Sequence, residues 1–260
     1  MTTLRIATVN VHSFRQPHSI SSNVTELSAI LAPLNLDVIA VQEMQENDRW
    51  REFSQRLSLP FSVYGPPKRT FCNGIISRYP IHWYSVQRTD FFCEGGTRSM
   101  LQFSLEGIQN IKFALTHLDH RNEDDRLRQI QKFQPHENNI DILIGDMNAL
   151  TREDYSDSYY RNIVLGKREK TDWERPRFDL TELITKQWKY QDTFRKMNPT
   201  LNDKQVATCP YGTRIDYIYT HPRMNAHWKL IECSIIDTNG ATDHHAVIAE
   251  FKQIAKYKID

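Results

Sequence analysis

The sequence predicts an α/β fold in which helices cover β-sheets. Short β-branched apolar runs alternate with segments of helical periodicity along the whole chain. Several of the apolar runs end in Asn, Asp, Glu or His. Open α/β sheets bind their ligands at the carboxyl ends of strands, so these polar side chains are expected to share one active site.

The first half of the chain contains five expected strands, which are residues 4–9, 37–41, 74–77, 99–105 and 111–116. Apolar residues at helical spacing predict helices over residues 24–31, 50–57 and 127–133. The segment Asn23-Val24-Thr25-Glu26 has the form of a capping box, so Asn23 is expected to cap the first helix.

The second half repeats this alternation. Strands are expected at residues 140–144, 214–220, 228–236 and 246–251, and a helix at 179–188. Residues 151–177 form the longest segment without clear periodicity, and such long loops are usually functional or mobile. The sequence contains no short repeat and no convincing linker. We therefore expect one domain over residues 1–260.

Composition excludes several classes of protein. The chain of 260 residues has a net charge of +1, which gives no global attraction to nucleic acid or acidic membranes. Cys72, Cys93, Cys209 and Cys233 are too widely spaced for a typical zinc motif or a dense disulfide framework. No signal peptide is apparent, and no apolar stretch approaches the roughly 20 residues of a membrane span. We expect an intracellular, cytoplasmic or nuclear protein without a membrane anchor, and a monomer.

Seven short blocks occur in a fixed order along the chain. They are Thr8-Val9-Asn10, Val41-Gln42-Glu43, residues 73–81, Thr116-His117-Leu118-Asp119, Gly145-Asp146-Met147-Asn148, Arg214-Ile215-Asp216-Tyr217-Ile218 and Thr242-Asp243-His244. Together they resemble the endonuclease/exonuclease/phosphatase superfamily. The resemblance implies a four-layered α/β sandwich, with two packed mixed β-sheets flanked by helices, and a metal-dependent phosphoric-ester hydrolase.

The resemblance also implies a cation site. Mg²⁺ commonly binds one or two carboxylates together with water and phosphate, and Mn²⁺ is a possible substitute. Glu43 matches the principal metal ligand of the superfamily, and Asn10 would orient phosphate or complete the outer shell of the metal. Asp243 would contact this metal or a second one. Considered alone, Glu43 could be an exposed glutamate at a helix start and Asn10 a turn residue.

The catalytic groups are expected at other strand ends. By resemblance, Asp146 orients or deprotonates the attacking water and Asn148 donates a hydrogen bond to phosphate, although Gly-Asp-x-Asn also favours a plain Asx turn. Asp216 interrupts a β-compatible run, and a buried aspartate needs a partner. His244 is the natural partner, because an Asp–His pair fixes the imidazole tautomer and stabilises its protonated form. Whether His244 is a general base or a cationic phosphate stabiliser stays open.

His117 matches a histidine that contacts the scissile phosphate in many branches of the superfamily. Asn73 stands where deoxyribonuclease I has a glutamate that supports this histidine, so a second carboxylate–histidine pair is not expected. Arg126 and Gln129 match a common Arg-x-x-Gln pairing and are interpreted as architectural.

The substrate is the least determined feature. Nucleic acid is the favoured class, for a nuclease or a DNA-end-processing phosphodiesterase. A candidate binding surface comprises Arg161, Lys167, Arg168, Lys170, Arg175 and Arg177 around Trp173, although Glu169, Asp172 and Glu174 intervene. The alternatives are a phosphatase or phosphodiesterase acting on a small, inositol or lipid-derived phosphate, and an inactive binding module. The block around residues 209–217 departs from the inositol 5-phosphatase pattern, which counts against phosphoinositides.

Overall fold

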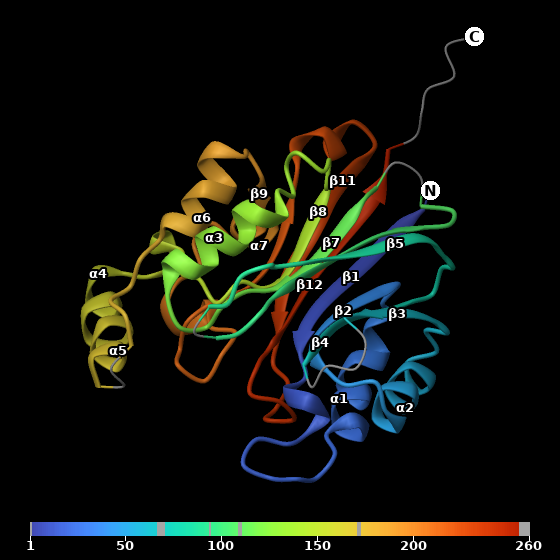
Figure 1. Cartoon of the computed structure of the whole chain (residues 1–260), viewed down its shortest axis with the longest axis horizontal. Coiled ribbons are helices and arrows are strands. Elements are labelled where there is room, and N and C mark those ends of the chain that lie inside the picture. Colours follow the sequence, from blue (N-terminus) through green and yellow to red (C-terminus); the bar gives the residue numbers. More distant parts are fainter. Residues whose placement is uncertain (1, 67–70, 94, 109–110, 171–172, 255–260) are drawn as a thin grey trace.

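Two six-stranded mixed sheets pack face to face, and helices cover their outer faces (Figure 1). A computed structural model describes residues 2–66, 71–93, 95–108, 111–170 and 173–254. The four-layered α/β arrangement expected from the sequence is confirmed. Among the described residues, no helix is long and apolar enough to cross a bilayer.

The strand order in the first sheet is β11-β12-β1-β2-β4-β3, and in the second it is β5-β6-β7-β8-β10-β9. Strands β1 and β2 run parallel, as do β7 and β8, while the other pairs are antiparallel. The first sheet comprises β1 (Thr3–Asn10), β2 (Val38–Met44), β3 (Phe61–Gly65), β4 (Cys72–Ser77), β11 (Trp228–Ile236) and β12 (Ala246–Gln253). The second comprises β5 (Ile81–Arg88), β6 (Ser99–Leu105), β7 (Phe113–His117), β8 (Ile142–Asp146), β9 (Gln191–Asp192) and β10 (Asp216–Thr220).

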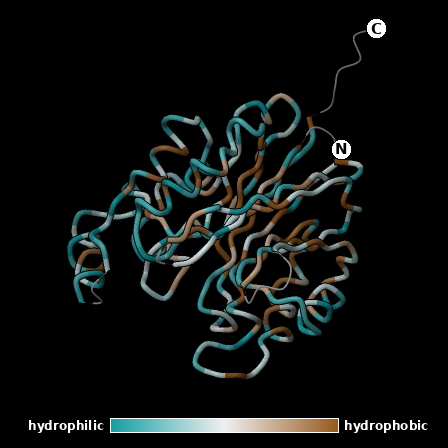
Figure 2. Tube along the Cα trace, in the orientation of Figure 1, coloured by the Kyte–Doolittle hydropathy of each residue, from teal (hydrophilic) through white to brown (hydrophobic). Residues whose placement is uncertain are grey.

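Side-chain alternation along the strands produces three apolar layers. On β1, Leu4 and Ile6 point into the core between the sheets, whereas Ala7 and Val9 point to the helices on the outer face. The strands of the second sheet alternate in the same way between the central core and a third cluster. Figure 2 shows the hydrophobic residues concentrated along the strands. Both faces of each sheet are therefore covered, as in other α/β proteins.

Helices α1 (Val24–Leu31) and α2 (Asp48–Arg56) supply residues to the apolar cluster on the first sheet. Helices α3 (Glu123–Phe133) and α6 (Asp179–Glu182), with the π-helical turn η5 (Leu183–Gln187), do so on the second. The remaining helices are α4 (Asp157–Tyr159), α5 (Gly166–Lys170) and α7 (Thr193–Met197). Short turns complete the fold: η1 (His12–Phe14), η2 (Ala32–Leu34), η3 (Arg152–Asp154), η4 (Tyr160–Leu165), η6 (Asp203–Val206) and η7 (Pro222–Ala226).

The predicted capping box is wrong. The Asn23 side chain donates hydrogen bonds to the carbonyl oxygens of Val11 and Arg15 and caps no helix N–H group. The Glu26 carboxylate instead accepts a hydrogen bond from Gln16. Asn23 is fully buried, so its amide serves the neighbouring loop after β1 and not the first turn of α1.

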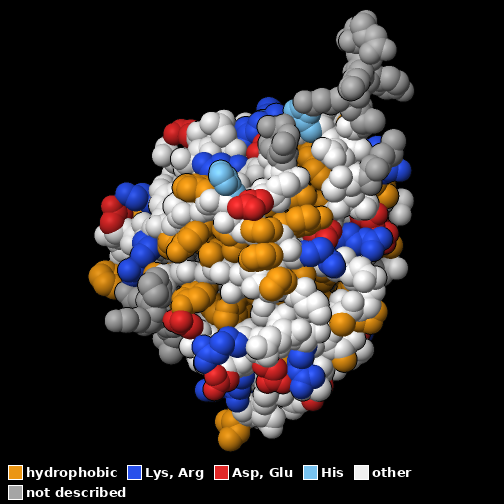
Figure 3. Space-filling model, turned by 90° about the vertical axis from the view of Figure 1, so that its right-hand side faces the viewer, with side chains coloured by type: hydrophobic (Ala, Val, Ile, Leu, Met, Phe, Trp, Pro, Cys, Tyr) orange, Lys and Arg blue, Asp and Glu red, His pale blue; other side chains and the backbone are white. Residues whose placement is uncertain are grey.

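Three strands, β3, β5 and the two-residue β9, and several short helices were not expected. Strands β3 and β5 lie at sheet edges, and their partly exposed side chains lack the clear burial pattern of central strands. They carry the exposed aromatic side chains of Phe61, Trp83 and Tyr84. On the side seen in Figure 3, hydrophobic side chains gather in bands among charges of both signs. The aperiodic segment 151–177 contains η3 and then α4, η4 and α5, which follow one another without a gap. The π-helical η4 in their middle shifts the side chains away from the α-helical period, so the sequence shows no regular helical pattern.

Candidate functional site

Polar side chains at strand ends of both sheets lie along one edge of the sandwich. The parallel pairing of β1 with β2 places Asn10 opposite Gln42, next to Glu43. In the second sheet, Asp146 lies opposite both His117 and Asp216. Glu43 and Asp146 were expected just after their strands. In the structure Glu43 lies within β2, and Asp146 is the last residue of β8. The strand register thus brings these residues together before any side-chain contact is considered.

A hydrogen bond joins the two sheets at this edge. The side-chain amide of Asn10 donates to Glu43 Oε1 at 3.2 Å and to Asp146 Oδ2 at 3.3 Å. The backbone carbonyl oxygen of Asn10 accepts a hydrogen bond of 2.8 Å from the Thr242 hydroxyl, in the segment that also carries Asp243 and His244. Asn10 therefore links three segments that are far apart in the sequence.

The backbone at the site adopts conformations that side chains usually avoid. Gly145 has φ +138°, and a Cβ there would lie 1.9 Å from the carbonyl oxygen of Thr116, so only glycine fits. Glu43 has φ 57° at an irregularity in the pairing of β2 with β4, and Asn148 has φ 51°. Strained residues of this kind often occur where a side chain must be directed into a functional site.

Asp216 and His244 form the expected hydrogen-bonded pair. His244 Nδ1 lies 2.9 Å from Asp216 Oδ2, and both residues are buried. Burial lowers the pKa of His244, but the charge and hydrogen bond of Asp216 outweigh it and raise this pKa well above the ordinary value. The Oδ1 atom of Asp216 is buried without a hydrogen-bond partner among the described residues. The pair therefore favours a protonated imidazole and retains one free acceptor.

Asp146 lies between the two histidines. Its Oδ2 atom is 3.5 Å from His117 Nε2 and 3.9 Å from His244 Nε2, and its Oδ1 accepts a hydrogen bond of 2.9 Å from the Asn148 N–H. Burial, followed by the charge of Asp216, raises the pKa of Asp146 to about 7. Burial also lowers the pKa of His117 well below its ordinary value, which favours a neutral imidazole. This carboxyl group and the two imidazoles can exchange protons with a bound water or ester.

At this edge of the sandwich, two groups among the described residues offer ligands for a cation. Ligand atoms of Asp146, Asp216 and His244 all lie within 4.8 Å of one another, although His244 and Asp216 already bond to each other. In the second group, the Glu43 and Asp243 carboxylates lie 4.0 Å and 3.6 Å from His12 Nδ1. Oxygen ligands of this kind suit a hard divalent cation, and Asn10 adjoins both groups. The residues present therefore fit the metal that the superfamily resemblance implies.

The site opens into a cavity of about 410 Å³, here called the catalytic cavity. Glu43, His117, Asp146, Asn148, Asp243 and His244 all line it, and Asn10 and Asp216 support it through hydrogen bonds. Trp173 and Tyr211, whose rings meet edge to face with centroids 4.6 Å apart, form part of its wall. All predicted site residues thus meet at one place.

The predicted basic surface is neutralised in part. Arg177 pairs with Asp124 and Asp179 at 2.7 Å and 2.8 Å, and Arg175 lies 4.0 Å from Glu169. Arg168 lines the catalytic cavity with Trp173, and its guanidinium donates to the carbonyl oxygen of Glu174. Asp172 lies outside the described residues. Segment 161–177 therefore contributes only a part of its cations to the site. Arg126 and Gln129 bond to Asp119, in keeping with the architectural role expected for them.

Sequence reasoning missed His12, Arg98 and Tyr211. His12 follows Asn10 in the loop after β1 and contacts both Glu43 and Asp243. Arg98, just before β6, lines the catalytic cavity beside His117 and His120. The position of His12 after a polar strand end was an available signal, whereas Arg98 and Tyr211 reach the site only through tertiary folding.

We compared the sequence and the structure with those of known proteins. The model of the endonuclease/exonuclease/phosphatase family matches residues 7–244. Among curated proteins, none matches the chain closely enough to count as a relative. Similar solved structures include an endonuclease/exonuclease/phosphatase from Beutenbergia cavernae, with 16% identity, a TM-score of 0.69, and coverage of 96% of this chain and 72% of that one.

Two further structures have similar statistics. The 3′ phosphatase NExo from Neisseria, bound to a product DNA hairpin, has 16% identity and a TM-score of 0.69, over 96% of this chain and 99% of that one. An AP endonuclease from Archaeoglobus fulgidus has 17% identity and a TM-score of 0.66, over 95% and 98% of the two chains. Identities this low establish a shared fold only. On the match of its own sequence over residues 7–244, the chain belongs to the endonuclease/exonuclease/phosphatase family.

Proposed function

We propose that the protein is a divalent-metal-dependent phosphodiester hydrolase that acts on nucleic acid, with one catalytic domain over residues 1–260. The observation that carries this proposal is the convergence at one cavity of three carboxylates and two histidines, which are Glu43, Asp146, Asp243, His117 and His244. Asn10 donates hydrogen bonds to two of these carboxylates. Phosphodiester hydrolysis requires charge neutralisation on phosphate, a positioned water and a stabilised leaving oxygen. The cavity offers side chains for each requirement.

Each residue then has a defined role. Asp146 accepts a hydrogen bond from the attacking water and orients it toward phosphorus. Asn148 and His117 donate hydrogen bonds to the phosphate oxygens. His244 presents Nε2 to the phosphate, while Asp216 holds the ring through Nδ1. Such pre-positioned donors stabilise a transition state because they need no rearrangement during the reaction.

Glu43 and Asp243 are the proposed cation ligands, with Asn10 beside them. Both carboxylates are partly exposed, so a hydrated ion can reach them, whereas Asp216 is fully buried. Mg²⁺ is the proposed ion and Mn²⁺ a substitute; when bound, it would neutralise charge on the phosphate.

The aromatic part of the cavity supports a nucleic-acid substrate. Tyr211 and Phe71 line the cavity with large exposed fractions of 41% and 59%, so planar surfaces are available for stacking on a base. The Neisseria structure with its DNA hairpin and the archaeal AP endonuclease are consistent with this substrate class. A small phosphate ester is the alternative, because the cavity volume of about 410 Å³ also suits a small ligand.

A substrate panel tests the proposal. The purified chain is incubated with single- and double-stranded DNA, RNA, tyrosyl-DNA ends and inositol phosphates, each with Mg²⁺, Mn²⁺ or EDTA. We expect cleavage of at least one nucleic-acid substrate with Mg²⁺ and none with EDTA. Hydrolysis confined to inositol phosphates would instead establish the small-phosphate alternative, and no hydrolysis by a folded, metal-loaded protein would support an inactive binding module.

A further inference from the structure

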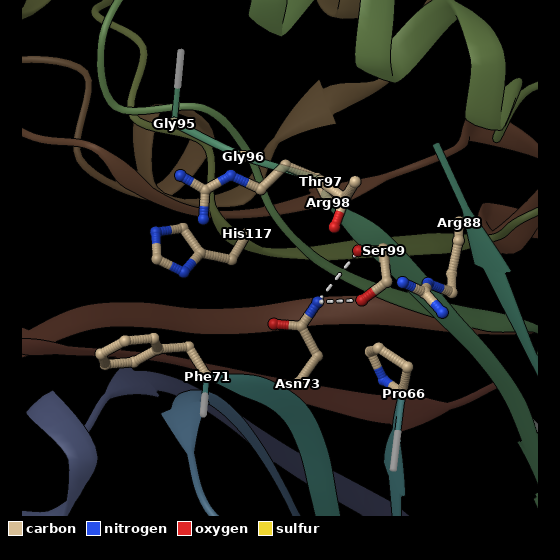
Figure 4. A pocket seen from close by; sticks show the side chains of 10 residues that line it. All are labelled: Pro66, Phe71, Asn73, Arg88, Gly95, Gly96, Thr97, Arg98, Ser99 and His117. Atoms are coloured by element: carbon tan, nitrogen blue, oxygen red, sulfur yellow. Dashed lines mark hydrogen bonds between the residues drawn. The ribbon is translucent and has the colours of Figure 1, made fainter. Parts of the chain in front are cut away.

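A second, smaller cavity adjoins the catalytic cavity and carries two arginines. Its volume is about 210 Å³, and its lining includes Arg88, Arg98, Asn73 and Ser99. It shares Arg98, His117, Phe71 and Gly95 with the catalytic cavity, so the two spaces lie side by side. Figure 4 shows the Arg98 guanidinium beside the His117 ring and Arg88 at the opposite end of the cavity. We call this space the arginine cavity.

Neither arginine has an acidic partner among the residues that the structure describes. The guanidinium of Arg98 contacts His120 Nδ1 at 3.2 Å, and its Nε atom is buried with no hydrogen-bond partner there. The nearby Asp119 carboxylate already accepts hydrogen bonds from the N–H groups of Gly95 and Arg121. Arg88 is exposed and forms no ion pair within the described part of the chain. A guanidinium donor that is buried without an acceptor is costly, so an anionic ligand would stabilise this arrangement.

Strand pairing and hydrogen bonds hold the backbone around the arginines. Arg88 ends β5 and lies opposite Ser99 at the start of β6. Two hydrogen bonds of 3.0 Å hold the backbone of Arg98: its N–H donates to the Thr89 hydroxyl oxygen, and its carbonyl oxygen accepts from the Thr89 N–H. Asn73 of β4 donates to the carbonyl oxygen of Ser99 at 3.0 Å and so ties the cavity floor to the other sheet. Both cations are therefore attached to positions where strands of the two sheets meet.

The loop before Arg98 approaches the guanidinium closely. A Cβ at Gly95 would lie 2.9 Å from Arg98 Nη2 and 2.2 Å from Asp119 Oδ2. Only a residue without a side chain leaves room for both groups. The local sequence Gly95-Gly96-Thr97 thus keeps space open beside the cation.

We propose that the arginine cavity binds a second phosphate of the substrate, the one adjacent to the scissile phosphate in the same nucleic-acid strand. This inference rests on the proposed function. The cavity is smaller than the roughly 300–1,000 Å³ of typical organic-ligand pockets, so it suits a compact anion better than a nucleoside. Arginine binds phosphate through several N–H donors in a planar arrangement. Because the two cavities adjoin at His117, neighbouring phosphates of one strand can reach both.

The test removes one charge from the substrate, one from the protein, or both, and compares the effects. The cleavage position in a short single-stranded oligonucleotide is first mapped with wild-type protein and Mg²⁺. Two further oligonucleotides carry one uncharged methylphosphonate, placed on the 5′ or the 3′ side of the cleaved linkage. The kcat/KM of wild-type protein, Arg88→Gln and Arg88→Lys is measured on all three substrates. Arg56→Gln is the matched control, since Arg56 is an exposed arginine on α2 that lines neither cavity.

We expect one of the two methylphosphonates to lower the wild-type kcat/KM by about 10- to 100-fold, the range for losing a charge-assisted hydrogen bond. Arg88→Gln should lower kcat/KM on the unmodified oligonucleotide by a similar factor. The kcat/KM of this variant should be nearly the same on the unmodified oligonucleotide and on the one with that methylphosphonate. Arg88→Lys should retain part of the preference, and Arg56→Gln should match the wild type. Circular dichroism verifies that the variants are folded.

Two results would overturn the inference while leaving the proposed function intact. In one, wild-type protein cleaves all three oligonucleotides equally well. In the other, Arg88→Gln loses the same factor on the charged and the neutralised substrates, which assigns Arg88 a structural role. A third result would refute only the nucleic-acid form of the inference. In it, Arg88→Gln lowers kcat/KM on a small bisphosphate and leaves kcat/KM on DNA and RNA unchanged. Absence of any nucleic-acid cleavage by wild-type protein would refute the proposed function itself.

Discussion

Replacing either Asp216 or His244 should lower kcat strongly, and replacing both should cost little more. The two side chains are joined by a hydrogen bond of 2.9 Å, and Asp216 is fully buried. His244→Ala removes the imidazole that faces Asp146 and the phosphate site. Asp216→Asn keeps the shape of the side chain but removes the charge that fixes the ring, so the remaining histidine loses its orientation and its protonated form.

The magnitude follows from the role of the pair. Acid–base or charged-donor assistance by a positioned side chain is worth about 10²–10⁴-fold in rate, or about 3–5 kcal/mol of transition-state stabilisation. We expect each single variant to lose a factor in this range. Residues that act as one unit give non-additive losses, so the double variant should lie within about threefold of the weaker single variant.

The assay is kcat on a cleavable oligonucleotide at saturating Mg²⁺. The neighbouring pair Asp237 and His245 provides a matched control, because its atoms lie 3.4 Å apart and neither residue lines the catalytic cavity. Asp237→Asn and His245→Ala should therefore leave kcat within about twofold of wild type. If the losses from Asp216→Asn and His244→Ala multiply in the double variant, the two residues act independently and the pair as described here is wrong.

Three other perturbations have defined outcomes. Arg214→Met should destabilise the fold by about 3–5 kcal/mol in urea unfolding, because it removes the buried guanidinium that pairs with Asp154 at 2.8 Å and with Asp192 at 2.6 Å and leaves Asp154 with Arg195 alone among the described residues; an unchanged unfolding midpoint would contradict this. Gly145→Ala should cost about 2–6 kcal/mol by the same measurement, since strain at φ +138° adds to a clash with Thr116, and a stable, active variant would refute that reading. Trp173→Ala should raise KM for an oligonucleotide by about 5- to 100-fold through lost stacking while kcat changes less; an equal effect on p-nitrophenyl phosphate would show that the ring does not serve base binding.

The central strands and their polar ends were predictable because two physical signals coincide there. Strands β1, β2 and β8 are buried on both faces, so their sequences are short apolar runs that stop at a polar residue. Their convergence follows from the general rule that ligands bind at strand ends. The hydrogen bond between Asp216 and His244 was predictable from the need of a buried carboxylate for a partner.

Other parts of the site depend on tertiary packing and leave no local pattern. Arg98 reaches the cavity because the pairing of β5 with β6 fixes its backbone, and nothing in the residues around it indicates this. The basic residues of segment 161–177 suggested a continuous binding surface, but Arg177 finds acidic partners on α3 and α6. Asn23 had the right type for a helix cap, yet buried carbonyl groups compete for its amide. In each case a long-range contact overrides the local preference.

The most direct test of the account is the effect of Glu43→Gln on Mg²⁺ binding and on oligonucleotide cleavage. Calorimetric titration with Mg²⁺ and the initial cleavage rate are measured for wild type, Glu43→Gln, and Glu52→Gln as an exposed control on α2. We expect EDTA to abolish wild-type cleavage and Mg²⁺ to restore it. Glu43→Gln should bind Mg²⁺ at least about tenfold more weakly and cleave about 10²-fold more slowly, while Glu52→Gln behaves as wild type. Unchanged Mg²⁺ affinity in Glu43→Gln, or full cleavage by wild-type protein in EDTA, would contradict it.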